Sequence, residues 1–455
     1  MSTIISTNPA TGVQIKTYDL HTDEMIADRL EAAQKTWQEW RQVSFAKRSE
    51  LMMEAAQVLE SKKETYAKIM TAEMGKTYRS AIAEVEKCAW VCRYYAENAA
   101  GFLADEFIDT DATKSGICYQ PLGVILAVMP WNYPMWQVFR FAAPALMAGN
   151  VAVLKHASNV PESALRIEEV FRLAGFPKGA FNTLLIKSDQ VKAIIENPVV
   201  KAVTLTGSEG AGAAVSAAAA KQLKKSVLEL GGSDPYIILE DADLEHAAEQ
   251  CCQSRLLNAG QSCIGAKRFI IVEPVYEKFL QLFADKMKNA KMGDPMGEVD
   301  LGPLARRDLR EEVHNQVMES VQMGAKLLIG GEVPEGDGAF YPPTILTDVA
   351  PGMPAYEEEI FGPVASVFRA ADESDALRIA NDTTFGLGAC VFTRDLTRGE
   401  RIAKHELNAG CCFVNAFVKS DPRLPFGGIN RSGFGRELSH LGIREFVNTK
   451  TFYVK

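Results

Sequence analysis

Two hydrophobic patterns divide the chain. Over about the first hundred residues, apolar side chains recur at steps of three and four, as in Ile26, Leu30 and Ala33, which predicts helices. From about residue 123, short runs rich in Val, Ile and Leu alternate with helical stretches such as 161–174. This alternation is typical of a parallel α/β sheet. The strands predicted in this first series are 123–129, 151–154, 181–186, 202–206 and 227–230.

A second series of the same kind begins near Pro235 and runs to about residue 430. Two α/β layers in succession predict two domains with a cleft between them. Outside both series, 449–455 is strand-like and 107–120 resembles a hairpin, and both need another sheet edge, which a partner subunit could supply. The strands predicted in the second series are 268–272, 326–329, 364–368, 390–393 and 411–414.

Composition restricts the class of protein. The 455 residues are 47% hydrophobic and 24% charged, as in a soluble globular chain of two or three domains. The net charge of −9 argues against a nucleic-acid partner, since phosphates are bound by basic surfaces. We expect neither a signal peptide nor a membrane span, because the N-terminus has no basic start and no long apolar run.

Cysteine and histidine usage adds two expectations. The nine cysteines form no C-x-x-C framework, which indicates reduced thiols and predicts a cytoplasmic protein. The six histidines are scattered without the spacing of metal ligands, so we expect no metal site.

Cys263 and Glu229 are the candidate reactive groups. The thiol follows small residues and Gly260, and the carboxylate precedes Gly231 and Gly232. A thiolate can form a covalent intermediate with a carbonyl carbon, and a nearby carboxylate can activate the water that breaks it. The pair therefore predicts covalent catalysis at a carbonyl group.

A nucleotide-binding turn is predicted after the strand 202–206. Gly207 and Ser208 follow that strand and precede an Ala-rich helix, where free backbone N–H groups and the helix dipole can bind a pyrophosphate. The segment is not a G-x-G-x-x-G fingerprint, so an ordinary tight turn is the alternative. Lys155 and Ser158 follow another strand at the edge where α/β sheets bind ligands, although a solvated lysine would fit there equally well.

These segments, together with six others in the same order, resemble the aldehyde dehydrogenase superfamily over essentially the whole chain. The resemblance implies an aldehyde dehydrogenase-like α/β fold with two α/β domains, parallel sheets and a small β oligomerisation element. It implies a cofactor-binding domain at 1–102 and 122–231, a catalytic domain at 232–430, and an oligomerisation element at 103–121 and 440–455. The six further matching segments are Asn8–Gly12, Pro130–Pro134, Pro144–Leu146, Val153–Lys155, Glu358–Pro363 and Pro425–Gly428.

The resemblance also implies catalytic roles. Cys263 matches the nucleophile, and Asn132 matches the side-chain amide that donates to the oxyanion together with the backbone N–H of Cys263. Glu229 matches the base that activates water to hydrolyse the thioester. A thiol needs a lowered pKa to react at neutral pH, and the sequence does not identify which neighbours lower it.

The cofactor residues implied by the resemblance form a second set. Glu359 matches the carboxylate that binds the nicotinamide ribose, although it could be a surface carboxylate. Phe361 matches the ring beside the nicotinamide, although it could be ordinary core. Members that prefer NAD often carry a glutamate where this chain has Ser158, so we expect NADP to be used well, with NAD also possible. The remaining implied cofactor contacts are Trp131, Lys155, Gly207 and Ser208.

The substrate residues come from a closer resemblance, to the bacterial NAD(P)-dependent succinate-semialdehyde dehydrogenases. Arg140 and Ser420 match their contacts to the distal carboxylate of the substrate, and Trp136 should face the substrate tunnel. A buried arginine needs an anion, which could instead be a protein carboxylate. One departure is Leu257, where those enzymes often carry a second arginine.

The leading hypothesis is therefore oxidation of succinate semialdehyde to succinate by NADP or NAD. The alternatives are oxidation of glutarate semialdehyde or general aliphatic aldehydes, a cysteine hydrolase or acyl-transferase without hydride transfer, and a non-catalytic nucleotide-binding or structural protein. The resemblance further implies a homodimer or homotetramer.

Overall fold

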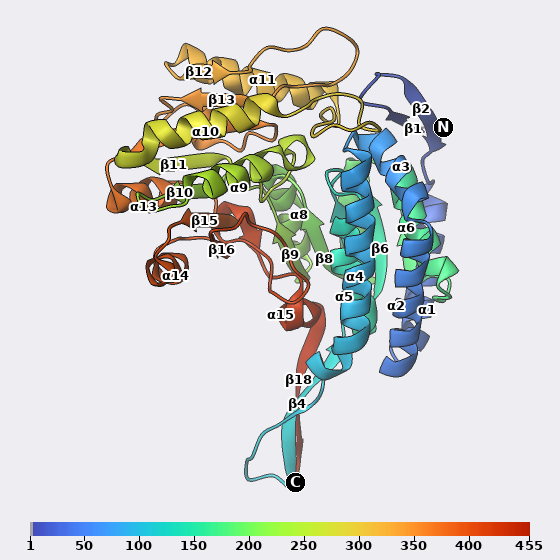
Figure 1. Ribbon diagram of the computed structural model, residues 1–455. Helices are drawn as coiled ribbons and strands as arrows, with labels where there is room; N and C mark the ends of the chain where they lie inside the picture. Colours follow the sequence, from blue (N-terminus) through green and yellow to red (C-terminus); the bar gives the residue numbers. More distant parts are fainter. Residues whose placement is uncertain (1–2) are drawn as a thin grey trace.

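The structure, a computed structural model, describes residues 3–455. Two sheets with mainly parallel strands form its framework (Figure 1). The first sheet has the strand order β17-β9-β8-β5-β6-β7, and only β17 among these runs antiparallel to its neighbour. From the central strand β5, the chain adds β6 and β7 on one side of the sheet and then β8 and β9 on the other side. The strands are β5 (Val124–Met129), β6 (Val151–His156), β7 (Phe181–Thr183), β8 (Val200–Thr206), β9 (Lys225–Glu229) and β17 (Gly433–Phe434).

The second sheet has the order β12-β13-β14-β11-β10-β15-β16, with β12 as an antiparallel edge strand. The α/β fold class and the two parallel-rich sheets predicted from the sequence are confirmed. Sequence analysis did not delimit β10 or β13, each only four residues long. The strands are β10 (Pro235–Ile238), β11 (Arg268–Val272), β12 (Lys326–Ile329), β13 (Thr344–Thr347), β14 (Val364–Ala370), β15 (Gly388–Phe392) and β16 (Cys411–Val414).

Helices cover both sheets, and several begin at a Ser, Thr or Asp whose side chain caps them. Thr22, Ser44 and Thr77, for example, each accept a hydrogen bond from a backbone N–H of the following first turn. Among residues 3–455, no helix combines the length and the apolar character needed to cross a membrane.

The first group of helices comprises α1 (Asp23–Trp40), α2 (Phe45–Ser61), α3 (Lys63–Met74), α4 (Tyr78–Phe102), α5 (Trp136–Ala148), α6 (Pro161–Leu173), α7 (Val191–Glu196) and α8 (Glu209–Lys221). The second comprises α9 (Leu244–Leu256), α10 (Tyr276–Asn289), α11 (Arg307–Gln322), α12 (Pro354–Glu357), α13 (Glu373–Asn381), α14 (Leu396–His405) and α15 (Ser439–Arg444). Short 3-10 turns are η1 (Ser188–Gln190), η2 (Leu257–Gly260), η3 (Glu273–Val275) and η4 (Asn430–Ser432).

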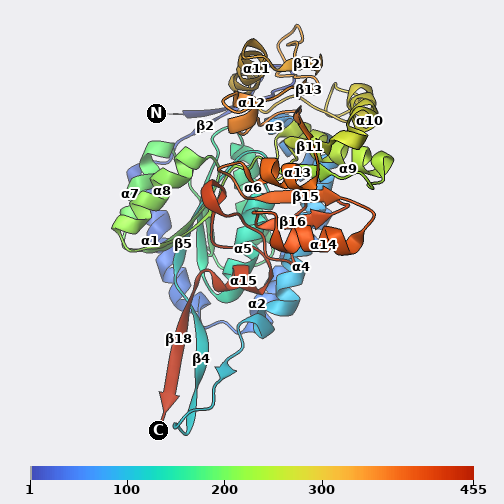
Figure 2. The ribbon, with the colours of Figure 1, turned by 90° about the vertical axis from the view of Figure 1, so that its left-hand side faces the viewer.

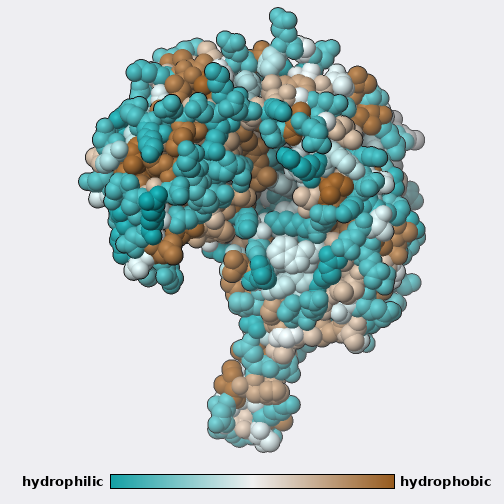
Figure 3. Space-filling model, viewed as in Figure 1, coloured by the Kyte–Doolittle hydropathy of each residue, from teal (hydrophilic) through white to brown (hydrophobic). Residues whose placement is uncertain are grey.

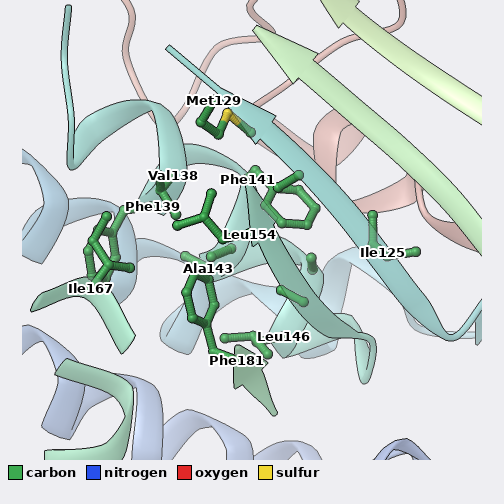
Figure 4. Packing of buried hydrophobic residues seen from close by; sticks show 14 of the residues in the cluster. Ile125, Met129, Val138, Phe139, Phe141, Ala143, Leu146, Leu154, Ile167 and Phe181 are labelled. Carbon is green, nitrogen blue, oxygen red and sulfur yellow. The ribbon is translucent and has the colours of Figure 1, made fainter. Parts of the chain in front are cut away.

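The core of the first unit surrounds α5. Every residue of this helix is buried, and Figure 4 shows Val138, Phe139 and Phe141 packed among side chains of the neighbouring strands and helices. A helix that is apolar on all sides belongs inside a layered fold. Two polar side chains, Gln137 and Arg140, are exceptions on this helix.

A narrow arm projects from the body and carries the C-terminus at its tip (Figures 1 and 2). It consists of β3 (Glu106–Phe107), β4 (Lys114–Pro121) and β18 (Val447–Val454), and β18 pairs antiparallel with β4 along its whole length. The C-terminal strand therefore finds its partner edge within its own chain. Figure 3 shows apolar residues on the arm, where Phe107, Ile108, Tyr453 and Val454 are exposed.

The N-terminal segment differs from the sequence expectation, which was mainly helical. The hairpin of β1 (Thr3–Thr7) and β2 (Gln14–Asp19) precedes α1. Ile4 and Tyr18 form a small cluster with Leu185, so the hairpin is stabilised by a few contacts outside the main core.

Loops at the strand ends of the two sheets contact each other. The carboxyl ends of β5, β6, β8 and β9 lead into Asn132, Lys155, Gly207 and Glu229. The amino ends of β10, β11 and β14 are preceded by segments that contain Cys263 and other candidate residues. Loops of the two units are in contact at these ends, because Asn132 is hydrogen-bonded to the loop of Cys263 and Gly232, after β9, to Glu359, before β14. Ligands are expected at this carboxyl edge of an open parallel sheet.

A buried carboxylate fixes one of these loops. Glu84 of α4 accepts hydrogen bonds from the backbone N–H groups of Met135 and Trp136, both 2.9 Å long. It also forms an ion pair with Lys76, whose side chain is fully buried and lies 4.0 Å from the centre of the Tyr133 ring. The negative charge thus satisfies backbone donors at the start of α5, directly after Asn132.

We predict that Lys76→Met lowers the free energy of unfolding by about 3–5 kcal/mol, because it leaves the buried Glu84 charge without its partner. Urea denaturation of the variant and the wild type measures the difference. Lys63→Met, which breaks the exposed Lys63–Glu86 pair, is the control and should change the midpoint little. Equal midpoints for Lys76→Met and the wild type would contradict this account.

Candidate active site

Cys263 lies in a sharply turned loop between η2 and β11. Asn258, Ala259 and Gly260 adopt left-handed backbone conformations in succession, with φ angles of 56°, 54° and 77°. A side chain at Gly260 would collide with the Gly362 carbonyl group, so only glycine fits there. Left-handed Ala259 is a strained conformation that surrounding contacts must maintain, and such residues cluster at functional sites.

Asn132 is tied to this loop through Gln261. Its Nδ2 donates to the backbone oxygen of Gln261 at 3.2 Å, and Asn258 Nδ2 donates to the backbone oxygen of Asn132 at 2.8 Å. The amide side chain after β5 and the cysteine loop before β11 therefore form one hydrogen-bonded unit. Among the described residues, Asn132 Oδ1 is buried without a hydrogen-bond partner.

Lys267 joins the cysteine loop to Glu359. Its ammonium group donates to the backbone oxygens of Ser262 and Cys263 at 2.9 and 2.8 Å, and lies 3.0 Å from Glu359 Oε1. The same Oε1 accepts from the backbone N–H of Gly232 at 3.1 Å, while Oε2 faces Gly231. A Cβ at Gly231 would collide with that carboxylate, so glycine is required here by close approach.

The Cys263 thiol is not activated by burial. Burial raises its pKa to about 12, whereas the positive charges of Arg140 and Lys267 act to lower the pKa. The thiol is therefore protonated at neutral pH in the ligand-free protein. These two cations are the activating neighbours that the sequence did not reveal.

The Glu229 side chain lies on the Gly427 side of the cleft. A Cβ at Gly427 would be 2.7 Å from Glu229 Oε1, and among the described residues neither carboxylate oxygen has a hydrogen-bond partner. Burial, and next the charge of Glu437, raise the pKa of Glu229 well above its usual value, while Arg140 and Arg436 lower it. The loop after Glu229 approaches the cysteine loop, because a Cβ at Gly232 would lie 2.9 Å from the Cys263 carbonyl oxygen.

A cavity of about 220 Å³ opens beside Cys263. Trp136, Arg140 and Ser420, the three predicted substrate residues, all line it together with the thiol. The cavity is mainly apolar in its lining, with aromatic side chains from three segments. The aromatic residues are Tyr133, Trp136, Phe417 and Phe426.

Arg140 has a protein carboxylate as a partner. Its Nε forms a buried ion pair with Glu437, its Nη2 lies 3.4 Å from Thr206 Oγ1, and its guanidinium group lies 4.6 Å from the centre of the Phe426 ring. The sequence left this pairing open as an alternative. The role of Arg140 in substrate binding stays a prediction, because the ion pair with Glu437 leaves room for a further contact with a substrate carboxylate.

The carboxyl edge of the first sheet offers a polar, open surface. Gly207 follows β8. A Cβ at this position would contact only Leu205, at 3.6 Å, so no contact within the protein explains why the residue is a glycine. Ser208 caps α8 by accepting from the N–H of Ala211. The open glycine at a helix N-terminus fits the close approach of a pyrophosphate.

Lys155 and Ser158 lie on the same edge, at and just after the end of β6. Lys155 is buried with its Nζ 3.5 Å from Ser188 Oγ, and Ser158 is exposed. The rings of Trp131 and Phe361 are in edge-to-face contact, with ring centres 5.7 Å apart and planes at 83°. These positions, with Glu359, suit a dinucleotide lying across the sheet edge. Within residues 3–455 no group of three or more His, Cys, Asp or Glu side chains is arranged to hold a metal ion.

Four charged residues of the site were missed in the sequence: Glu84, Lys87, Lys267 and Glu437. Glu84 and Lys87 did carry a signal, because they interrupt the otherwise apolar stripe of α4 that includes Val85 and Cys88. Lys267 and Glu437 carried none, since their partners Glu359 and Arg140 are distant in the chain.

Known proteins provide an independent comparison. A model of the aldehyde dehydrogenase family matches residues 1–452. A probable succinate-semialdehyde dehydrogenase (NADP+) of Synechocystis sp. is 51% identical, and succinate-semialdehyde dehydrogenase (NADP+) 1 of Mycobacterium tuberculosis is 50% identical; each alignment covers 99% of both chains.

Solved structures agree. The succinic semialdehyde dehydrogenase of Streptococcus pyogenes, solved in complex with NADP+, has a TM-score of 0.97 and 40% identity over 99% of both chains. An NAD-dependent aldehyde dehydrogenase of Sinorhizobium meliloti has a TM-score of 0.97 and 32% identity, covering 100% of this chain and 91% of its own. With its sequence, its fold and the cleft between its sheets in agreement, this chain belongs to the aldehyde dehydrogenase family.

Proposed function

We propose that this protein oxidises succinate semialdehyde to succinate with NADP+. The observation that carries the proposal is the cavity that extends from Cys263 to cationic and hydroxyl groups, including Arg140 and Ser420. An apolar passage with a positive end suits a short aldehyde whose far end is a carboxylate. The names of the similar enzymes from Synechocystis, Mycobacterium and Streptococcus support the same substrate.

The first chemical step uses the cysteine loop. Cys263 loses its proton to solvent, and its sulfur attacks the aldehyde carbon to form a thiohemiacetal oxyanion. The Asn132 amide and the backbone N–H of Cys263 donate to that oxyanion, and a donor of this kind contributes about 10²–10³ in rate. Arg140 and Lys267 favour the thiolate through their positive charges.

The second step releases the acid. Bound at the edge of the first sheet, NADP+ would supply the acceptor for the hydride that leaves the former aldehyde carbon. Cys263 then carries a thioester, and Glu229 removes a proton from the water that hydrolyses it. Burial raises the pKa of Glu229, whereas the charges of Arg140 and Arg436 lower it and so favour the carboxylate that this step uses.

Cofactor contacts follow the edge of the first sheet. Phe361, in contact with Trp131, would lie beside the nicotinamide end, and Glu359 would accept from a ribose hydroxyl. Gly207 and Ser208 would meet the pyrophosphate at the start of α8. Exposed Ser158, beside Lys155, would leave room and a hydroxyl donor for the 2′-phosphate, so NADP+ is tolerated and NAD+ remains usable.

We also propose a function for each part of the chain. Residues 1–102 and 122–231 bind the cofactor, and 232–430 supply the catalytic cysteine. The arm, within 103–121 and 440–455, joins two or four copies, because it exposes Phe107 and Val454 at the edges of its small sheet. The mass in solution, measured by light scattering, tests the association.

A panel of aldehydes tests the substrate. With either cofactor, we expect kcat/KM for succinate semialdehyde to exceed that for butanal, which has the same chain length, by about 100-fold or more, because the carboxylate adds charge-assisted contacts. Glutarate semialdehyde measures the length preference. Cys263→Ala should abolish reduced-cofactor formation. Acid formation without reduced cofactor would favour a hydrolase instead.

The role of Glu229 predicts a kinetic signature. In Glu229→Gln, the steps before hydrolysis remain intact, so each site should produce about one reduced cofactor in a burst. Steady turnover should then fall by about 10²–10⁴-fold, the usual contribution of a general base. Stopped-flow absorbance measures both phases. Glu50→Gln, in an exposed ion pair with Lys47 on α2, is the control and should turn over normally; loss of the burst in Glu229→Gln would assign this residue to an earlier step.

Ser158 predicts cofactor choice. In Ser158→Glu, a carboxylate would repel the 2′-phosphate, so KM for NADP+ should rise about 10-fold or more while KM for NAD+ changes little. Steady-state kinetics with each cofactor measures the ratio. Ser158→Gln, equal in size but uncharged, separates repulsion from crowding, and an equal effect in both variants would rule out the charge explanation.

A further inference from the structure

We propose that Lys87 is the principal residue that binds the distal carboxylate of the substrate. This inference rests on the proposed function, since it assumes a carboxylated aldehyde. It assigns that contact to a lysine of α4, a residue that the sequence did not single out.

The position of Lys87 suits this role. It lines the same cavity as Cys263, and its Nζ donates to Ser420 Oγ at 2.8 Å. The ammonium group also lies 4.3 Å from the centre of the Trp136 ring, whose face favours a cation. Two of the predicted substrate residues therefore hold the Lys87 ammonium group at the wall of the cavity.

Charge balance separates Lys87 from Arg140. Among residues 3–455, no carboxylate forms an ion pair with Lys87, because the nearby Glu84 pairs with Lys76 and Asp421 pairs with Arg423. Arg140, in contrast, already has Glu437. A cation enclosed in an apolar cavity without a counter-ion is unfavourable, and an entering carboxylate removes that cost.

The ionisation of Lys87 is consistent with this balance. Burial, and next the charge of Arg140, lower its pKa to about 8, so the side chain is still mainly protonated near pH 7. A bound carboxylate would stabilise the protonated form further. Arg140 then adds attraction at longer range.

Ser420 completes the subsite. Because its oxygen accepts the hydrogen bond from Lys87, its own proton is available to an acceptor in the cavity. Lys87 and Ser420 together can each donate to one carboxylate, one with a charge and one without. The contact is thus bidentate, with its two donors held on α4 and on the loop before Phe426.

The test compares succinate semialdehyde with butanal near pH 7. In Lys87→Met, we expect KM for succinate semialdehyde to rise about 10- to 100-fold, the usual value of a charged hydrogen bond, with little change for butanal. Lys87→Arg should keep most of the discrimination. Arg93→Met is the matched control, since it removes a charge from the outer face of the same helix, where Arg93 pairs with Glu60.

The outcomes distinguish the two proposals. A wild type that does not prefer succinate semialdehyde overturns the proposed function. A wild type with that preference and a Lys87→Met variant that retains it overturns the role of Lys87 alone. If Lys87→Met is too unstable to assay, Lys87→Gln, which keeps a polar group beside Ser420, takes its place. Equal losses for both aldehydes in that variant, or a selective loss only in Arg140→Gln, would also refute the assignment.

Discussion

The site depends on one constraint: the strand ends of the two sheets lie opposite each other, so that their loops are in contact. One parallel sheet presents its carboxyl ends and the other its amino ends, so the loops around Asn132 and Gly232 from the first contact the loops of Cys263 and Glu359 from the second. Loops at strand ends are free of ladder hydrogen bonds, and their polar groups can therefore turn toward a ligand. Neither sheet alone holds both the thiol and the amide that serves it.

Buried charges keep these loops in place. Glu84 satisfies the first N–H groups of α5, and Lys267 binds two carbonyl groups of the cysteine loop as well as Glu359. Such groups contribute little net stability when fully paired, but a missing partner is costly. Their value here is positional, because each one joins a catalytic loop to an element from a distant part of the chain.

Local patterns predicted the architecture well. The bounds of β11, β12 and β16 agree with the hydrophobic runs, because each run lies between turn residues. The hairpin β1–β2 was missed, since its largely exposed strands lack an apolar pattern, as in β2. Of the residues selected by the family motifs, Cys263, Arg140, Trp136 and Ser420 line one cavity, and the roles assigned to them stay predictions. Pairings such as Arg140 with Glu437 could not be predicted, because they depend on tertiary contacts across hundreds of residues.

The arm has a practical consequence for handling the protein. Lys455 lies at the tip of β18, far from the N-terminal hairpin (Figure 1). An affinity tag fused after Lys455 would extend from the strand edge proposed above to contact another copy, whereas a tag before β1 would leave that edge clear. Purification handles and fluorescent fusions therefore belong before β1.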